Sequence, residues 1–127
     1  MYKGIGLDLC EISRMEKMVE NAHFLQRYFT EEEIRYIQSR GAHRAESLAG
    51  IYAAKEAFSK AMGTGICFDL REVEIRHGEN GEPCYALHGE TAEKTKGEGF
   101  LLSISHDGGI AGAVCLREKT EKQEKNR

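Results

Sequence analysis

The sequence predicts one small domain of mixed α and β structure, in which a long central helix packs on a largely antiparallel sheet. Three observations predict this fold. Residues Leu48–Gly65 have the periodicity of a helix, and residues Lys3–Cys10 alternate as in a strand. The second half of the chain contains two hairpin patterns, and hairpins pair strands in the antiparallel sense. The 127 residues, 40% of them hydrophobic, suffice for one domain and are too few for two.

Composition excludes several classes of protein. The formal net charge of −3 argues against nucleic acid as the main partner, because duplex binding usually requires a clustered basic excess. The four cysteines lie far apart without a C-x-x-C pair, which indicates reduced core residues rather than a zinc site or disulfides. There is no signal-peptide h-region, and no apolar stretch approaches the ~20 residues of a membrane span. We therefore expect a cytoplasmic protein without a membrane segment.

The first element is the strand Lys3–Cys10, with a period of two that predicts one buried face. Three apolar residues alternate there with two glycines and an aspartate: Ile5, Leu7 and Leu9 with Gly4, Gly6 and Asp8. Glycine weakens a strand unless a neighbour must approach its backbone closely. Asp8 is therefore either a ligand beside a close backbone approach or the cap of the next turn.

Two short helices follow the strand. Ser13–Glu16 has the pattern of a capping box that opens a first helix, and Thr30–Glu33 repeats the pattern before a second one that Gly41 ends. Arg14 and Lys17 share the exposed face of the first helix. Their charges are either a local basic patch or ordinary solubilising surface charges.

The central helix is expected to have two faces fit for burial. One carries large apolar residues and the other carries small ones: Leu48, Ile51, Phe58 and Met62 on the first, and Gly50, Ala54, Ala57 and Ala61 on the second. The third face carries Glu56 and Lys60, which are spaced as a surface ion pair. Lys55 falls among the apolar residues, so it must reach the surface or meet an anionic partner. We expect the helix to end in a C-cap formed by Gly63, Thr64 and Gly65. This segment is not expected to be a phosphate loop, because such loops precede the N-terminus of a helix.

The rest of the chain is read as two hairpins with a polar, helix-compatible stretch between them. The first hairpin turns at Asn80 and Gly81, and Pro83 stands at the start of its second strand. The second turns at Asp107–Gly109, where His106 is either structural or catalytic. We place the domain at residues 1–116 and expect the charged tail, 117–127, to be disordered because it contains no apolar residue.

Two isolated carboxylates suit a hard cation. Asp8 and Glu56 stand on separate elements, each beside small residues. Mg²⁺ accepts one or two carboxylates and takes its remaining ligands from water and from the phosphates of a substrate. Lys60, one turn beyond Glu56, is then placed to face those phosphates.

Several separated segments form a set that is specific in its order and spacing, even though Lys-Glu-Ala alone is common. These segments are Gly4-Ile5-Gly6-Leu7-Asp8 with Glu11-Ile12 and Arg14, Phe29-Thr30, Ala53-Ala54-Lys55-Glu56-Ala57 with Lys60-Ala61, Gly63-Thr64-Gly65-Ile66, Asn80-Gly81-Glu82-Pro83 and Ser103-Ile104-Ser105-His106. Through this set the chain resembles the holo-acyl-carrier-protein synthases, the short bacterial phosphopantetheinyl transferases, over residues 4 to about 116.

The resemblance implies transfer of 4′-phosphopantetheine from coenzyme A to a serine of apo acyl carrier protein, in support of fatty acid biosynthesis. It implies Mg²⁺ held by Asp8 and Glu56, with Lys60 as a catalytic phosphate clamp. Coenzyme A would be bound by residues within the matching segments, namely Lys60, Gly63, Thr64, Gly65, Asn80, Pro83 and His106. A homotrimer with active sites between subunits is also implied.

An acidic carrier protein requires a local basic surface, because the whole chain is net acidic. Arg14 and Lys17 follow shortly after Asp8, and Arg27 is expected to extend their patch.

One departure from the family concerns the residues before the Ala-Ala-Lys-Glu-Ala segment. Many relatives have Arg-Phe there and this chain has Ile51-Tyr52, so any phosphate contact of that arginine is absent. A non-catalytic coenzyme A or nucleotide-binding module is the alternative, followed by a Mg²⁺-dependent phosphohydrolase.

Overall fold

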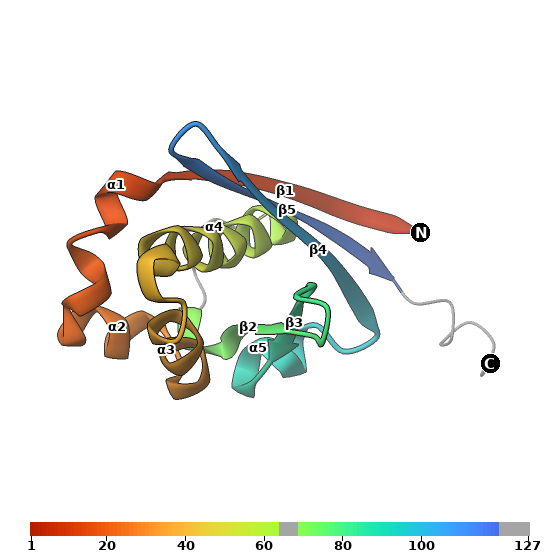
Figure 1. Ribbon diagram of the computed structural model, residues 1–127. Helices are drawn as coiled ribbons and strands as arrows, with labels where there is room; N and C mark the ends of the chain where they lie inside the picture. Colours follow the sequence, from red (N-terminus) through yellow and green to blue (C-terminus); the bar gives the residue numbers. More distant parts are fainter. Residues whose placement is uncertain (64–68, 120–127) are drawn as a thin grey trace.

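The computed structural model describes residues 1–63 and 69–119 (Figure 1). The strands are β1 (Tyr2–Glu11), β2 (Val73–His77), β3 (Pro83–Leu87), β4 (Glu98–Asp107) and β5 (Ile110–Lys119). The helices are α1 (Ile12–Met15), α2 (Ala22–Tyr28), α3 (Glu31–Gln38), α4 (Arg44–Met62) and α5 (Gly89–Lys94). Three short 3₁₀ turns connect them at Met18–Glu20, Gly41–His43 and Leu70–Glu72. The mixed α and β composition confirms the expected fold class.

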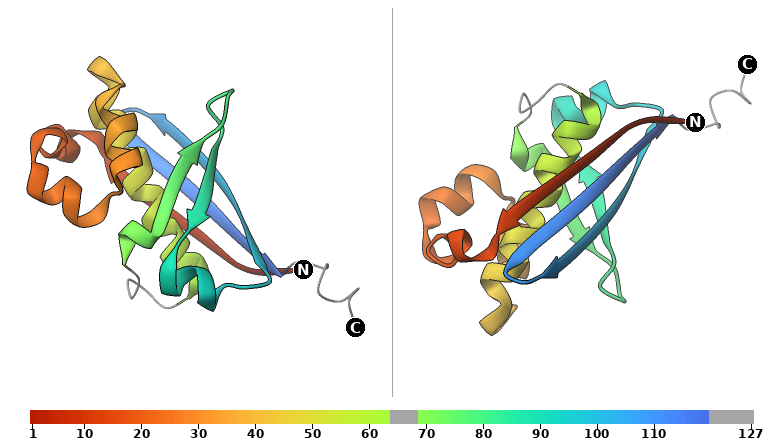
Figure 2. Two further views of the ribbon diagram at one scale, coloured as in Figure 1. Left: turned by 90° about the horizontal axis from the view of Figure 1, so that it is seen from below. Right: turned by 90° about the horizontal axis from the view of Figure 1, so that it is seen from above.

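The strands form two antiparallel sheets on either side of α4. The larger sheet has the order β1-β5-β4, and the smaller is the hairpin β2-β3. Figures 1 and 2 show the larger sheet crossing one side of α4, while the hairpin, α3 and α5 lie on the other side. The long helix is therefore enclosed by both sheets, as expected for the centre of the domain.

The β1 strand lies directly on the backbone of α4. A Cβ atom added to Gly4 would overlap the carbonyl oxygen of Ala61, and one added to Gly6 would overlap that of Ala57. The face of β1 that is buried in the chain is thus the glycine and Asp8 face. The apolar face is exposed, with 65% of Ile5, 60% of Leu7 and 64% of Leu9 accessible. The alternation of the strand and its one buried face were correctly predicted, and the buried face is the one with the glycines and Asp8 rather than the apolar one.

The buried side of α4 contains a complete ion pair. Lys55 is 0% exposed, and its ammonium lies 2.8 Å from Glu33 Oε1. It also donates to the carbonyl oxygens of Leu70 at 2.7 Å and Val73 at 2.9 Å. Of the two alternatives for Lys55, the surface or an anionic partner, the structure shows the anionic partner. Glu33 accepts from Thr30 N in the expected capping box of α3, so one carboxylate joins the helix cap to the core.

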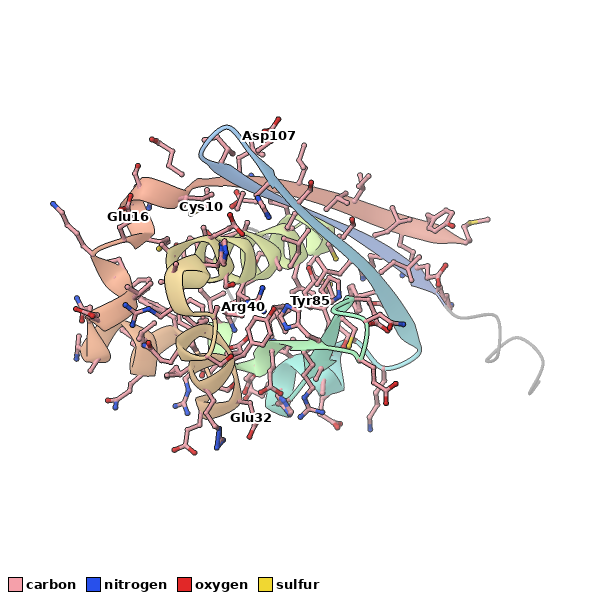
Figure 3. All side chains as sticks on the ribbon, viewed as in Figure 1. Cys10, Glu16, Glu32, Arg40, Tyr85 and Asp107 are labelled. Atoms are coloured by element: carbon pink, nitrogen blue, oxygen red, sulfur yellow. The ribbon has the colours of Figure 1, made fainter. Side chains whose placement is uncertain are left out.

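Aromatic rings fill the space between α4 and the hairpin. The Phe58 ring centroid lies 5.5 Å from that of Tyr85 and 4.8 Å from that of Phe100. Tyr85, labelled between α4 and β3 in Figure 3, donates from its hydroxyl to the carbonyl oxygen of Ala54 at 2.7 Å. This bond satisfies the one polar atom that the ring brings into the core.

Several local predictions need correction. The helix α1 begins at Ile12 after Glu11 and has no side-chain cap, so the capping box at Ser13 is wrong; a helix of four residues is too short to depend on one. The strand β5 continues to Lys119, three residues beyond the expected domain end, because Arg117 forms a two-point contact with Glu98 at 3.1 and 2.8 Å. Residues 120–127 of the expected tail lie outside the described residues.

The cysteines are only partly core residues. Cys10 and Cys115 are buried, Cys84 is exposed, and Cys67 lies outside the described part of the chain. None of the three described cysteines is in a disulfide. Among residues 1–63 and 69–119, no helix is both long and apolar enough to cross a membrane.

Candidate active site

Two carboxylates and a lysine meet where β1 crosses α4. Lys60 donates to Asp8 Oδ1 at 3.0 Å and to the carbonyl oxygen of Leu7 at 3.0 Å. Lys60 therefore pairs with the strand, and the described residues record no ion pair between it and Glu56. The N-cap of α1 is Glu11, so Asp8 is not the cap of that helix. The structure thus brings together the three residues that the sequence singled out.

Glu56 is the unsatisfied member of this group. Its Oε2 atom is buried and has no hydrogen-bond partner among the described residues. Burial raises the pKa of Glu56, the charge of Asp8 raises it further, and Lys60 opposes both. A buried carboxylate oxygen without a partner is costly, and two nearby carboxylates repel one another. A cation between them would remove both penalties.

The donor set fits Mg²⁺ in particular. Within the described residues there is no cluster of three or more potential protein ligands, as a closed structural metal site would have. Mg²⁺ is usually held by only one or two carboxylates and keeps open positions for water and phosphate. Asp8 and Glu56, with one orphaned oxygen, are the pair that such an ion would use.

A first cavity, of about 470 Å³, includes Tyr52, which lies one helical turn before Glu56 on α4. Its lining combines basic, apolar and aromatic side chains: Ser13, Arg14, Met15, Lys17, Met18, Phe24 and Tyr52. Burial raises the pKa of Tyr52, and the charge of Glu56 raises it further, so this wall of the cavity borders the carboxylate site. Arg27 is not part of the lining; its guanidinium lies 5.5 Å from the ring of its neighbour Tyr28. The structure therefore joins Arg14 and Lys17 and leaves Arg27 apart.

A second cavity, of about 210 Å³, gathers other candidate residues. It is lined by parts of α3, α4, β4 and the β2–β3 turn: Tyr36, Arg40, Glu46, Ser47, Gly50, Ile51, His77, Gly81, Pro83, Ile104 and His106. The Nε2 atom of His106 lies 3.1 Å from Glu46 Oε1. Asn80 lies in the adjoining turn, where its backbone N–H donates to Glu82 Oε1 at 3.0 Å. Figure 3 shows Asp107, the residue after His106, at the tip of the β4–β5 hairpin.

Sequence reasoning missed several residues of this second cavity. Tyr36, Arg40, Glu46 and His77 line it. Tyr36 and Arg40 are four positions apart, but no regular spacing connects them to Glu46 or His77. Only the stacking potential of Tyr36 and His77 was available as a signal, and pairing them required the tertiary fold. Gly63 is the expected left-handed C-cap of α4, with φ of 76°, whereas Thr64 and Gly65 lie outside the described residues.

The second cavity and the carboxylate site lie on different faces of α4. Gly50 lines the second cavity, and Glu56 belongs to the carboxylate site. Six residues at about 100° each place these two positions roughly 120° apart around the helix. A ligand that used both sites of one chain would have to pass around the helix.

Comparison with known proteins identifies close relatives. The family model described as the 4′-phosphopantetheinyl transferase superfamily matches residues 4–115. A holo-[acyl-carrier-protein] synthase of Treponema denticola is 37% identical over 122 residues, which cover 93% of this chain and 99% of the relative. The solved holo-[acyl-carrier-protein] synthase of Helicobacter pylori, in complex with coenzyme A, has a TM-score of 0.78 at 32% identity and covers 90% of this chain and 99% of its own. That of Bacillus anthracis, in complex with coenzyme A (3′,5′-ADP), has a TM-score of 0.80 at 35% identity, with 94% and 99% covered.

Proposed function

The chain belongs to the holo-acyl-carrier-protein synthase family of phosphopantetheinyl transferases, and from this premise we propose its reaction. It transfers 4′-phosphopantetheine from coenzyme A to a serine of apo acyl carrier protein, releases adenosine 3′,5′-bisphosphate and requires Mg²⁺. The observation that supports the metal is the orphaned Glu56 Oε2 beside Asp8. We further propose that the reaction takes place in the cytoplasm and serves fatty acid biosynthesis.

The reaction replaces one phosphorus–oxygen bond by another. The serine oxygen attacks the phosphorus next to the pantetheine arm, the bond to the second phosphate breaks, and the bisphosphate leaves with the electron pair. When bound, Mg²⁺ would neutralise the negative charge that develops on the diphosphate. Asp8 and Glu56 are the residues that would hold it. One of these carboxylates, acting through a water molecule, receives the serine proton in our proposal.

Lys60 holds the diphosphate in this scheme. The Lys60 side chain is 55% exposed, and its ammonium contacts one carboxylate oxygen of Asp8 and the carbonyl oxygen of Leu7. An exposed lysine is able to exchange such a contact for a phosphate oxygen without moving its backbone. The residues from Gly63 to Gly65, together with Asn80, Pro83 and His106, are proposed to bind the remainder of coenzyme A.

Assembly as a homotrimer is proposed from two features. The carboxylate site and the His106 cavity lie on different faces of α4, which suits active sites shared between neighbouring subunits. The outer face of the larger sheet also exposes leucines and an isoleucine that no described segment covers. We place the catalytic domain at residues 1–116 together with the end of β5, and the remaining residues outside it.

The cavity lined by Arg14 and Lys17 is the proposed docking surface for the carrier protein, and Arg27, which does not line it, is a proposed contact outside it. Met18 and Phe24 give it an apolar floor, and the two cations suit an acidic helix. The Arg14→Glu variant should raise KM for the carrier protein and leave KM for coenzyme A nearly unchanged. Equal carrier-protein KM values at low ionic strength would instead identify Arg14 as a solubilising charge.

One experiment separates the proposed function from its alternatives. The protein is incubated with coenzyme A, Mg²⁺ and an apo carrier protein, and intact masses are measured with and without EDTA. We expect the carrier to gain one phosphopantetheinyl group only when Mg²⁺ is free. No reaction would indicate a binding module, and cleavage of coenzyme A without a mass gain would indicate a phosphohydrolase.

A further inference from the structure

Tyr52 connects the first cavity to the carboxylate site. Its side chain lines that cavity together with Arg14. Tyr52 also lies four residues before Glu56 on α4, a spacing that places two side chains about 40° apart on one face of a helix. The ring of Phe24, on α2, has its centroid 6.4 Å from that of Tyr52 and limits the movement of the tyrosine ring. Tyr52 is therefore held where the docking surface meets the carboxylates.

The charges around the Tyr52 hydroxyl come from three elements. Burial raises the pKa of Tyr52 and Glu56 raises it further; Arg14 lowers it, and Cys10 and Asp8 raise it. These groups belong to α4, α1 and β1, so the hydroxyl lies close to the junction of the three elements. A tyrosine with a raised pKa keeps its proton at physiological pH. The Tyr52 hydroxyl is therefore a hydrogen-bond donor beside the carboxylate site.

This donor is free. Between residues 1–63 and 69–119, no hydrogen bond of the Tyr52 hydroxyl is recorded, whereas the hydroxyl of Tyr85 donates to the carbonyl oxygen of Ala54 at 2.7 Å. Glu56 Oε2 is the only buried side-chain nitrogen or oxygen without a partner in the described part of the chain. The unpartnered Tyr52 hydroxyl is thus not buried, and it is accessible at the wall of the first cavity. A free donor and an orphaned acceptor consequently stand one helical turn apart.

We infer that the Tyr52 hydroxyl donates a hydrogen bond to the oxygen of the acceptor serine and orients that oxygen for attack. This inference rests on the proposed function, to which it adds a residue that binds the acceptor. The serine has to extend from a carrier protein docked at the first cavity to the coenzyme A phosphorus at Asp8 and Glu56. Tyr52 lies between these two places.

The proposed contact is compatible with the reaction. A serine hydroxyl has two lone pairs and one proton. One lone pair accepts the hydrogen bond from Tyr52, the other forms the bond to phosphorus, and the proton passes to the water held by a carboxylate. Tyr52 neither gains nor loses a proton, so its contribution is to hold the attacking oxygen in line with the bond that breaks.

The first test is a double-mutant cycle on binding of the carrier protein. Tyr52→Phe removes only the hydroxyl and keeps the ring, and the carrier protein is used with its acceptor serine or with alanine in its place. We expect Tyr52→Phe to weaken binding of the serine carrier about fivefold, as for the loss of one hydrogen bond. Binding of the alanine carrier should be unchanged, because that carrier has no oxygen for Tyr52 to hold. Calorimetry without coenzyme A measures the four affinities.

Tyr28→Phe is the matched control. Tyr28 lies in the same aromatic group, with its ring centroid 5.3 Å from that of Phe24, but it does not line the cavity. Its loss of a hydroxyl should change no affinity and no rate. In the transfer assay, Tyr52→Phe should lower kcat about tenfold, because a serine oxygen that is free to rotate is less often in line with the phosphorus.

The outcomes separate this inference from the proposed function. Equal weakening of both carriers by Tyr52→Phe would place the contact on another part of the carrier protein, and no weakening of either would leave Tyr52 with its ring contacts alone. Each of these results, or an unchanged kcat, would overturn the inference and leave the proposed function intact. If the unsubstituted protein binds the carriers but transfers nothing, the proposed function has failed, and the binding cycle still decides the inference. Failure to bind either carrier would overturn both.

Discussion

Lys55 and Glu56 are consecutive residues of α4, and their hydrogen-bond partners distinguish a structural charge from a functional one. Lys55 is fully buried, and its three ammonium protons have three acceptors within 2.9 Å, one of them the Glu33 carboxylate. The next residue, Glu56, has a buried oxygen without any partner in the described part of the chain. An unsatisfied buried acceptor costs about 1–3 kcal/mol, a penalty that is offset when a ligand supplies the missing contact. Lys55 is therefore part of the core, and Glu56 is part of a binding site.

The first prediction at this scale concerns the metal. Glu56→Gln should retain the fold and reduce Mg²⁺ binding at least tenfold, because an amide oxygen offers no net charge to the cation. In the unsubstituted protein a protonated Glu56 cannot act as a ligand. Burial and the charge of Asp8 raise the pKa of Glu56. Mg²⁺ affinity should therefore be lost as the pH falls through that raised pKa, at a higher pH than the ~4.3 at which an ordinary glutamate titrates. Isothermal calorimetry at a series of pH values measures both effects.

Glu93→Gln is the control for this measurement. Glu93 is exposed and pairs with Lys96 at 3.1 Å on the surface, so its loss should leave Mg²⁺ binding unchanged. Mg²⁺ affinity that is the same in Glu56→Gln as in the control would remove Glu56 from the metal site.

At the scale of elements, local signals predicted local structure. The capping box at Thr30 and the turn at Asn80–Gly81 depend on residues within four positions of one another, and both are observed. The residue types suggested grouping Asp8 with Glu56 and Lys60, and the resemblance to a family strengthened that hypothesis, because no local signal connects residues that lie 52 positions apart. The stacking of Tyr36 on His77 was not accessible at all, since it requires β2 to lie against α3.

The orientation of β1 shows the same limit. Alternation fixed which residues share a face, but either face of a strand is able to turn toward the core. Normally the apolar face would do so. Here α4 approaches so closely that only Gly4 and Gly6 fit against the carbonyl oxygens of Ala61 and Ala57. Backbone contact, rather than apolar side chains, thus decides which face of β1 is buried.

The element-scale prediction tests this contact. In Gly6→Ala the new methyl group would overlap the carbonyl oxygen of Ala57, and neither backbone is free to move away. We expect a loss of about 1–3 kcal/mol in the free energy of unfolding, as for other overpacked sites. The displaced strand should also move Asp8 and lower the transfer rate. Urea unfolding at fixed protein concentration measures the stability.

Gly78→Ala is the matched control. The three atoms nearest to the added Cβ there belong to the carboxylate end of the Glu82 side chain, which is exposed and able to rotate away. Its effect should stay within about 0.5 kcal/mol, the usual range for a surface substitution. A Gly6→Ala protein as stable as this control would show that β1 and α4 have room to separate.

At the scale of the whole molecule, the exposed face of the larger sheet is the feature that one chain leaves incomplete. Ile5, Leu7 and Leu9 on β1 are more than half exposed, and so is Leu101 on β4. An apolar surface of this kind on a soluble protein marks a contact with another molecule. The same chain has its two proposed substrate sites on different faces of α4. Association of identical chains would cover the sheet and bring sites of different chains together.

The last prediction places an arginine in this face. Leu7 is 60% exposed in the single chain, so Leu7→Arg should leave the fold intact while placing a charge in the subunit contact. Light scattering should give about three times the 14.3 kDa chain mass for the unsubstituted protein, as for a closed cyclic trimer, and the mass of one chain for the variant. Gln26→Arg, on the exposed surface of α2, should remain trimeric and active. The Leu7→Arg monomer should lose most of its transfer activity because no partner completes the coenzyme A site. A monomer that keeps full activity would show that one chain contains the whole site, and the separation of the carboxylate site and the second cavity around α4 would then have to be bridged within a single subunit.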